Sequence, residues 1–171
     1  MTNGHLTETR IIAAKIYSCL PDNLKSEINL SDLQQAAMLH DYGKVLVPKE
    51  ILNKKGALTP KEKEIMELHS EFGYELLKQQ GVNERVLNLI KYHHQKPDGK
   101  GYPIIDNNYE YGISTQVLAV ADMYSALRED RSYHKARTKK EALEIIFQET
   151  EKGAISKDVY KALETAVIQG A

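Results

Sequence analysis

The sequence predicts an all-α protein, a compact single-domain bundle of about seven helices. Three observations support this fold class: helix-capping signals recur along the chain, apolar residues between them follow helical spacing, and no segment alternates apolar and polar residues for long enough to form a sheet. The chain has 171 residues, of which 42% are hydrophobic and 27% charged, which is the size and composition of one globular domain. We therefore expect residues 1–171 to fold as a single domain.

The predicted helices follow in chain order from their boundary signals. Capping boxes, in which a Ser or Thr precedes a Glu or Gln by three residues, start at Ser31, Thr59 and Thr138. Asn83 and Ser156 are suitable N-caps for two further helices. With the apolar spacing between these signals, the predicted helices cover residues 3–19, 31–42, 60–80, 83–95, 114–130, 138–152 and 156–169, with a short helical turn at 48–53.

One long connection, residues 96–112, remains between the predicted helices. It contains Gly99, Gly101, Pro103 and Gly112. Connections of this length without regular structure are usually functional. We expect this loop to be mobile in the absence of a ligand.

Charge and cysteine content exclude several classes of protein. The formal net charge of −1 provides no general attraction to a nucleic-acid polymer or an anionic membrane. A single cysteine, Cys19, excludes an internal disulfide framework and fits a reducing cytosol. The longest apolar stretch, Val117–Leu127, contains Asp122 and is too short to span a bilayer. We therefore expect a cytoplasmic protein that binds neither a nucleic-acid polymer nor a membrane.

Five of the six histidines and two aspartates occupy predicted apolar helix faces or helix ends. Individually, each has an ordinary explanation, because a core histidine can be hydrogen-bonded and a buried aspartate can pair with Lys or Arg. Together they indicate a metal centre, since one centre accounts for all seven residues at once. The seven are His5, His40, Asp41, His69, His93, His94 and Asp122.

The residue types of the candidate ligands and their spacing restrict which metal ions can bind and how many. Imidazole and carboxylate without thiolate suit Fe, Mn or Zn. Because adjacent residues on a helix point about 100° apart, His40 and Asp41 need not bind the same ion, which favours two divalent metal ions with a bridging carboxylate. Two such ions suit phosphoester hydrolysis. Lys44, four residues after His40, would share its helical face and hold a substrate phosphate, although a charge at a helix end is the ordinary alternative.

Three segments carry a family resemblance. Residues 39–44, LHDYGK, resemble the signature of the HD phosphohydrolase superfamily. Residues 93–103, HHQKPDGKGYP, are similar to the second signature of its HD-GYP branch. Residues 120–127, VADMYSAL, followed by RSY at 131–133, match the third block of that branch. The chain therefore resembles an HD-GYP domain over nearly its whole length, from residue 4 to 159.

The resemblance implies an all-helical metal-dependent phosphodiesterase that hydrolyses cyclic di-GMP, a bacterial second messenger, with a metal-activated water. It implies that Asp41 bridges the metal ions and, with Lys44, acts in catalysis. The seven His and Asp residues become the metal ligands. Substrate binding is implied for Lys44, Tyr102, Arg131 and His134. A regulatory or signalling protein is a further expected partner.

The chain departs from the family pattern at four places. Gln95 replaces the usual Glu, His134 replaces the usual Lys or Arg, and residues 104–109 lack the usual glycine. Met1 stands where some members carry a glutamate that binds a third metal, which favours two ions. These departures leave two alternatives open. One is hydrolysis of another cyclic or non-cyclic nucleotide, and the other is a module that senses a nucleotide or contacts a signalling partner without turnover.

Overall fold

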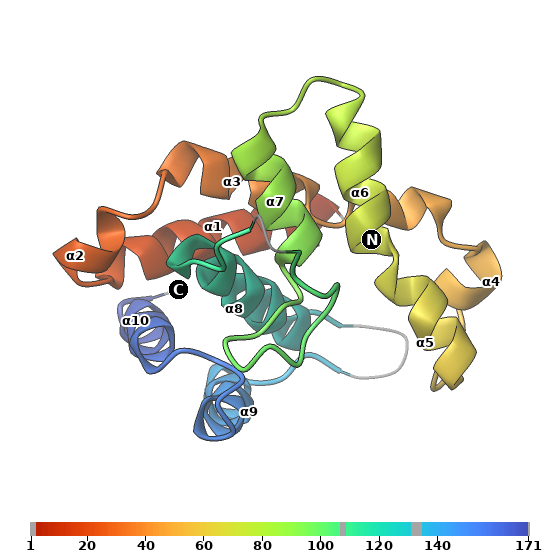
Figure 1. Cartoon of the computed structure of the whole chain (residues 1–171). Helices are drawn as coiled ribbons and strands as arrows, with labels where there is room; N and C mark the ends of the chain where they lie inside the picture. The colour runs from red at the N-terminus through yellow and green to blue at the C-terminus, as the bar shows by residue number, and fades with distance from the viewer. Residues whose placement is uncertain (1–2, 107–108, 131–134, 171) are drawn as a thin grey trace.

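The computed structural model describes residues 3–106, 109–130 and 135–170, and every regular element in these segments is helical (Figure 1). The all-α prediction is confirmed. In chain order the helices are α1 (Asn3–Cys19), α2 (Asp22–Lys25), α3 (Leu30–Leu39), the 3-10 helix η1 (Tyr42–Leu46), α4 (Lys49–Leu52), α5 (Pro60–Glu67), α6 (His69–Lys78), α7 (Glu84–Tyr92), α8 (Ile113–Arg128), α9 (Lys139–Glu151) and α10 (Lys157–Ile168).

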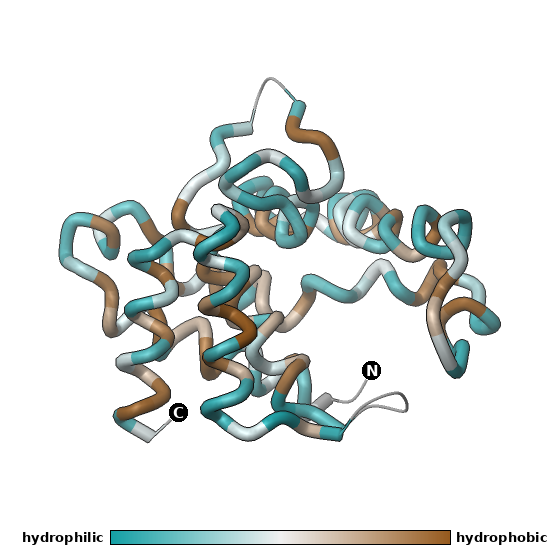
Figure 2. Tube along the Cα trace, turned by 90° about the horizontal axis from the view of Figure 1, so that it is seen from below, coloured by the Kyte–Doolittle hydropathy of each residue, from teal (hydrophilic) through white to brown (hydrophobic). Residues whose placement is uncertain are grey.

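The hydrophobic core lies around α1 and α8. Helix α1 packs against α3, α8 and α10, and α8 also packs against α9. In Figure 2, hydrophobic and hydrophilic residues alternate along the helices, as expected for amphipathic helices that share a core. Side chains such as Ile12, Leu33, Leu118 and Leu163 are fully buried, and each contributes about 1.5–3 kcal/mol to stability through removal from water.

Helices α4, α5 and α6 lie on the side of the molecule away from α9 and α10 (Figure 1). They connect to the rest through α6, which packs against η1 and α7. The contact between η1 and α6 is a close backbone approach, since both elements present a glycine there, Gly43 and Gly73. No helix in the described segments is both long and apolar enough to cross a membrane.

Three predicted helix boundaries were wrong. The helix expected over 31–42 ends at Leu39, and a 3-10 helix follows, so Lys44 does not share an α-helical face with His40. The helix expected over 60–80 is divided at Leu68, whose ψ of −14° departs from α-helical geometry. The helix expected over 83–95 ends at Tyr92. At each break a histidine ring hydrogen-bonds to a carbonyl three residues back, which competes with the helical hydrogen bond there.

Several other boundary predictions are confirmed, but the capping box at Ser31 does not form, and Ser156 precedes α10 without a side-chain capping bond. The short turn at 48–53 is α4, and the capping boxes at Thr59 and Thr138 both form, with reciprocal bonds to Glu62 and Glu141. Helix α3 begins earlier than expected, because Asn29 rather than Ser31 provides its cap. Helix α2 was not predicted.

Candidate metal centre

Helix ends bring the predicted ligands to one place. His40 caps the C-terminus of α3, His93 caps that of α7, and His69 begins α6 directly after the break at Leu68. Asp41 follows His40 and precedes η1, His94 follows His93, and the remaining two ligands come from α1 and α8. The first turn of α1 and the middle of α8 thus meet the ends of three other helices.

The seven side chains divide into two ligand groups. Within each group, one potential ligand atom per residue lies within 4.8 Å of the others. The first ligand group is Asp41, His69, His93 and His94. The second ligand group is His5, His40 and Asp122.

Three histidines have their ring orientation fixed in the same way. The Nδ1 atoms of His40, His69 and His93 lie 2.9, 2.7 and 2.7 Å from the backbone carbonyl oxygens three residues earlier. A carbonyl oxygen only accepts hydrogen bonds, so Nδ1 carries the proton in each ring. The Nε2 atom of each ring is therefore the one available to bind a metal ion.

Asp41 lies between the two ligand groups. Its Oδ1 is 3.3 Å from His69 Nε2, in the first group, and its Oδ2 is 3.3 Å from His40 Nε2, in the second. The same Oδ2 accepts a hydrogen bond of 2.8 Å from Lys44 Nζ. On the other side of the second group, Asp122 Oδ1 lies 3.0 Å from His5 Nε2 and 3.4 Å from His40 Nε2. The carboxylate of Asp41 thus contacts one histidine in each ligand group.

The charges of the site are set by burial and by the two aspartates. Burial by itself lowers the pKa of His40, but the charges of Asp41 and Asp122 outweigh it and raise this pKa to about 10. Burial favours the neutral form of both aspartates, yet the positive His40 holds the pKa of each carboxyl well below its usual range. Burial lowers the pKa of His94 to about 3, and it also holds the pKa of His93 well below the usual value.

The residues fit divalent metal ions. His69 Nε2 and His93 Nε2 are only 3.4 Å apart, although Nδ1 carries the proton in both rings. Two nitrogen lone pairs at this distance repel each other unless a cation binds them. In addition, His40 Nε2 and Asp41 Oδ1 are buried and form no hydrogen bond with the described residues. Buried groups of this kind are usually paired or bound to a metal.

Gln95 organises the start of the long loop. The side chain is 3% exposed. Its Oε1 accepts hydrogen bonds from the backbone of Lys96 at 2.9 Å and Gly101 at 2.8 Å, and its Nε2 donates to the carbonyl of Pro103 at 2.9 Å. Tyr102 is held by these bonds in a stacked contact with His94, with ring centroids 4.8 Å apart. The loop therefore places an aromatic ring directly on a predicted metal ligand.

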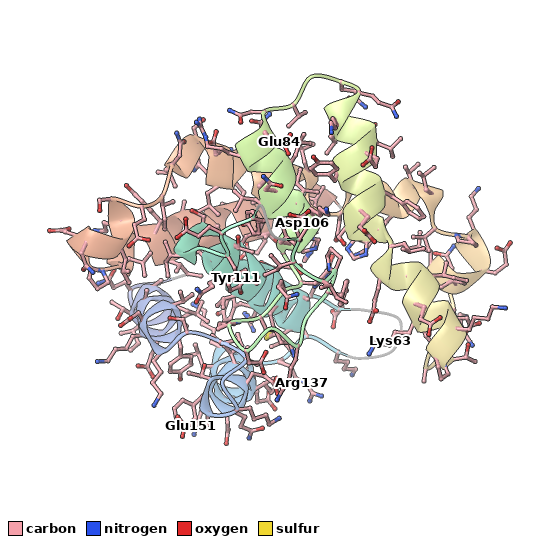
Figure 3. All side chains as sticks on the ribbon, viewed as in Figure 1. Lys63, Glu84, Asp106, Tyr111, Arg137 and Glu151 are labelled. Carbon is pink, nitrogen blue, oxygen red and sulfur yellow. The ribbon has the colours of Figure 1, made fainter. Side chains whose placement is uncertain are left out.

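The rest of the loop is anchored to the helices that flank it. Asp106 accepts a hydrogen bond of 2.9 Å from the Tyr92 hydroxyl, and the ring of Tyr109 stacks on that of Tyr92. Tyr111 donates its hydroxyl to the backbone oxygen of Gln95 at 3.0 Å. Figure 3 shows Asp106 beside α7 and Tyr111 beside α8. The Tyr109 hydroxyl also hydrogen-bonds with the Thr115 side chain, so the loop is attached to both α7 and α8.

Two cavities adjoin the two ligand groups. The smaller, of about 290 Å³, lies between the long loop, α8 and residues 154–156. The larger, of about 930 Å³, is lined mainly by residues of η1, α4 and the segment before α5, together with Tyr102. Asp41, Lys44 and His94 border both cavities. A ligand with two parts can therefore reach the same three side chains from both cavities.

All seven predicted metal ligands and Lys44 come together in the structure, and Tyr102 lies next to them. Arg131 and His134, predicted to bind substrate, lie outside the described residues. Sequence reasoning noted Gln95 only as a departure from the family. It missed Tyr111 and Gln116, which line the smaller cavity. The one sequence feature that pointed to these two residues was their position, since Tyr111 lies in the long loop and Gln116 lies just after it.

Comparisons with known proteins show the family to which the chain belongs. A family model described as an HD domain matches residues 2–157. A cyclic di-GMP phosphodiesterase of Thermotoga maritima is 39% identical over 121 residues, which is 68% of this chain and 32% of the relative. The 3'3'-cGAMP-specific phosphodiesterase 3 of Vibrio cholerae is 31% identical over 151 residues, 85% of this chain and 33% of the relative. The chain thus spans about a third of the length of these curated relatives.

A solved structure is similar in fold over almost the entire chain. It is that of an HDGYP protein from Bdellovibrio bacteriovorus, with a TM-score of 0.73. The match covers 99% of this chain and 53% of that one, at 17% sequence identity.

Proposed function

Because this chain belongs to the HD domain family, we propose that it is a metal-dependent phosphodiesterase that hydrolyses cyclic di-GMP. The observation that carries the proposal is the position of Asp41, which contacts one histidine in each of two ligand groups. The names of relatives that act on cyclic dinucleotides support the choice of substrate. We propose residues 1–171 as one domain of the HD-GYP type.

The proposed cofactor is a pair of divalent ions, Fe, Mn or Zn, one in each ligand group. Asp41 would bridge them, since its two oxygens face different groups. Bound there, the ions would act as Lewis acids on a phosphoryl oxygen and activate the attacking water. The neutral state of His93 and His94, which follows from their lowered pKa values, leaves both rings ready to act as ligands.

The remaining proposed roles belong to side chains around the ions. Lys44 borders both cavities and would hold a phosphate oxygen with its ammonium group. Tyr102 offers a ring beside His94 on which a base can stack. Arg131 and His134 are proposed to contact the nucleotide. For the whole protein we propose a cytoplasmic location and a signalling partner, with the single free cysteine, Cys19, in support of the former.

Metal removal and return test this function. Purified protein is treated with a chelator, dialysed, and assayed on cyclic di-GMP by chromatography before and after addition of Mn²⁺ or Fe²⁺. We expect the chelated protein to be inactive and either ion to restore turnover. A matched sample of the Asp41→Asn variant should stay inactive after metal is returned. Turnover that survives complete metal removal would contradict the proposal.

A second candidate substrate is 3'3'-cGAMP. It is favoured by the relative that matches 85% of this chain and is named for that substrate. The same assay with both cyclic dinucleotides at equal concentration gives the preference directly as the ratio of the two kcat/KM values. A non-catalytic module is less well supported, because all seven ligand side chains are present and assembled.

A further inference from the structure

The smaller cavity has apolar walls although it adjoins the carboxylates of Asp41 and Asp122. One wall is a face of α8, where Ala119, Met123 and Ala126 recur at helical spacing. Ile155 contributes a further apolar side chain. These residues form an apolar surface that continues up to Asp122 and the metal ligands. A charged phosphate alone would gain nothing from such a surface, whereas a flat aromatic group would.

Tyr111 adds an aromatic ring to this cavity. Its hydroxyl is already engaged, since it donates to the backbone oxygen of Gln95. That bond fixes the ring, which lines the cavity. Figure 3 shows Tyr111 beside α8. A ring held in place in this way is a stacking surface for a planar ligand. Any nucleobase can stack on such a ring, because every base has a flat π-face.

Gln116 provides a polar group in the wall of the smaller cavity. It lines the same cavity, one turn before Ala119 on α8, and its Oε1 is buried with no hydrogen-bond partner among the described residues. An unpaired buried amide oxygen is unfavourable, and a ligand that donates an N–H would satisfy it. Purine bases carry such N–H groups on their edges. A fixed ring, an apolar wall and an unpaired acceptor are together the chemistry that recognises a nucleobase.

We propose that the smaller cavity binds one purine base of a cyclic dinucleotide, with the base stacked on Tyr111 and its edge donating to Gln116. Its volume of about 290 Å³ is at the lower limit of ligand sites and suits one base rather than a whole dinucleotide. The phosphodiester then lies at the wall formed by Asp41, Lys44 and His94, and the rest of the molecule extends into the larger cavity. The proposal rests on the proposed function for the identity of the ligand.

The test uses ligands that cannot be turned over. Binding of 5'-GMP and of ribose 5-phosphate to the Mn²⁺-loaded protein is measured by calorimetry, so that the difference between them reports the base alone. The wild-type protein should prefer 5'-GMP. In Gln116→Met, which keeps the side-chain size without the amide, the preference should fall roughly tenfold, as for one lost hydrogen bond. Ala126→Leu, which fills the cavity, should abolish the preference.

Ala57→Leu is the matched control, because Ala57 lines only the larger cavity. It should retain the preference for 5'-GMP, and melting temperatures confirm that each variant is folded. If Gln116→Met and Ala126→Leu bind 5'-GMP like the wild type, or if Ala57→Leu alone loses the preference, the base subsite is refuted. A wild-type protein without any preference for 5'-GMP also refutes it.

The subsite and the proposed function can fail separately. A protein that hydrolyses cyclic di-GMP but is insensitive to the cavity variants would retain the function and lose the subsite. A protein that does not hydrolyse the dinucleotide, yet loses 5'-GMP preference in both variants, would retain the subsite and lose the function.

Discussion

Gly43 and His69 approach each other so closely that a Cβ atom on Gly43 would stand 1.9 Å from the carbonyl oxygen of His69. The same atom would lie 2.3 Å from the backbone nitrogen of Gly73. Both obstacles are backbone, so neither can move aside by a change of rotamer. The contact holds η1 against α6, and it places Asp41, two residues before Gly43, within 3.3 Å of His69 Nε2.

The first prediction concerns this contact. Gly43→Ala should lower the free energy of unfolding by about 1–3 kcal/mol or more, because η1 and α6 must separate to admit the methyl group. Metal occupancy should fall with it, since Asp41 then moves away from His69. Gly112→Ala is the control: the nearest atom to its added Cβ would be 3.9 Å away. Thermal melting and elemental analysis are the measurements, and equal results for the two variants would contradict the prediction.

The second prediction separates a bridging ligand from a phosphate-binding residue. Asp41→Asn removes the charge that faces both ligand groups, so metal occupancy and turnover should both collapse. Lys44→Ala should keep the metals and lose about 10²–10³ in kcat, the size expected for one stabilising group at a developing charge. Full metal occupancy in the Asn variant, measured by elemental analysis against the wild type, would argue against a bridge.

The third prediction is a proton release on metal binding. The pKa of His40 is about 10 without metal, so at pH 7 the ring is protonated, whereas a ligating ring must be neutral at Nε2. Metal binding at pH 7 should therefore release about one proton from His40. The affinity for the metal ion should increase by up to tenfold for each unit by which the pH is raised, as long as the pH is below 10. Calorimetric titration of Mn²⁺ in buffers with different ionisation enthalpies measures this. Identical heats in all buffers would contradict the release of a proton from His40 on metal binding.

The ligand positions could be predicted from sequence because they depend on helical geometry. The direction of a side chain on an apolar stripe or at a helix end is set by the 3.6-residue period, and the five histidines and two aspartates at such positions lie around one place. The helix breaks could not be predicted in this way. The apolar pattern continues through Leu68, and the break there depends on the bond from His69 to Met66, which the sequence does not show.

Lys44 and the cavity residues show a second limit of prediction from the sequence. Lys44 reaches Asp41 from a 3-10 turn and not from the predicted helical face, although the two side chains still meet at 2.8 Å. Tyr111 and Gln95 meet through a hydrogen bond across an irregular loop, 16 residues apart in the chain. Contacts of this kind have no periodicity, so only the three-dimensional structure reveals them.

The fourth prediction is that Gln95 holds the loop that carries Tyr102. Gln95→Met keeps the size of the side chain but removes its three hydrogen bonds, to Lys96, Gly101 and Pro103. The backbone amides of Lys96 and Gly101 should then exchange with deuterium at least about tenfold faster, the factor expected when opening becomes easier by about 1.4 kcal/mol. Exchange followed by mass spectrometry or NMR measures this without any substrate.

Gln95→Glu, which introduces the residue usual at this place in the family, should give an intermediate result. Its carboxylate can still accept from the amides of Lys96 and Gly101, but when ionised it has no hydrogen to donate to the Pro103 carbonyl, 2.9 Å from the present amide nitrogen. The same Gln→Met change at Gln80, which is exposed, is the control and should leave exchange in the loop unaltered. If Gln95→Met also left it unaltered, the amide would not be what orders the loop, and the contacts of Tyr92, Tyr109 and Asp106 would be sufficient to hold it.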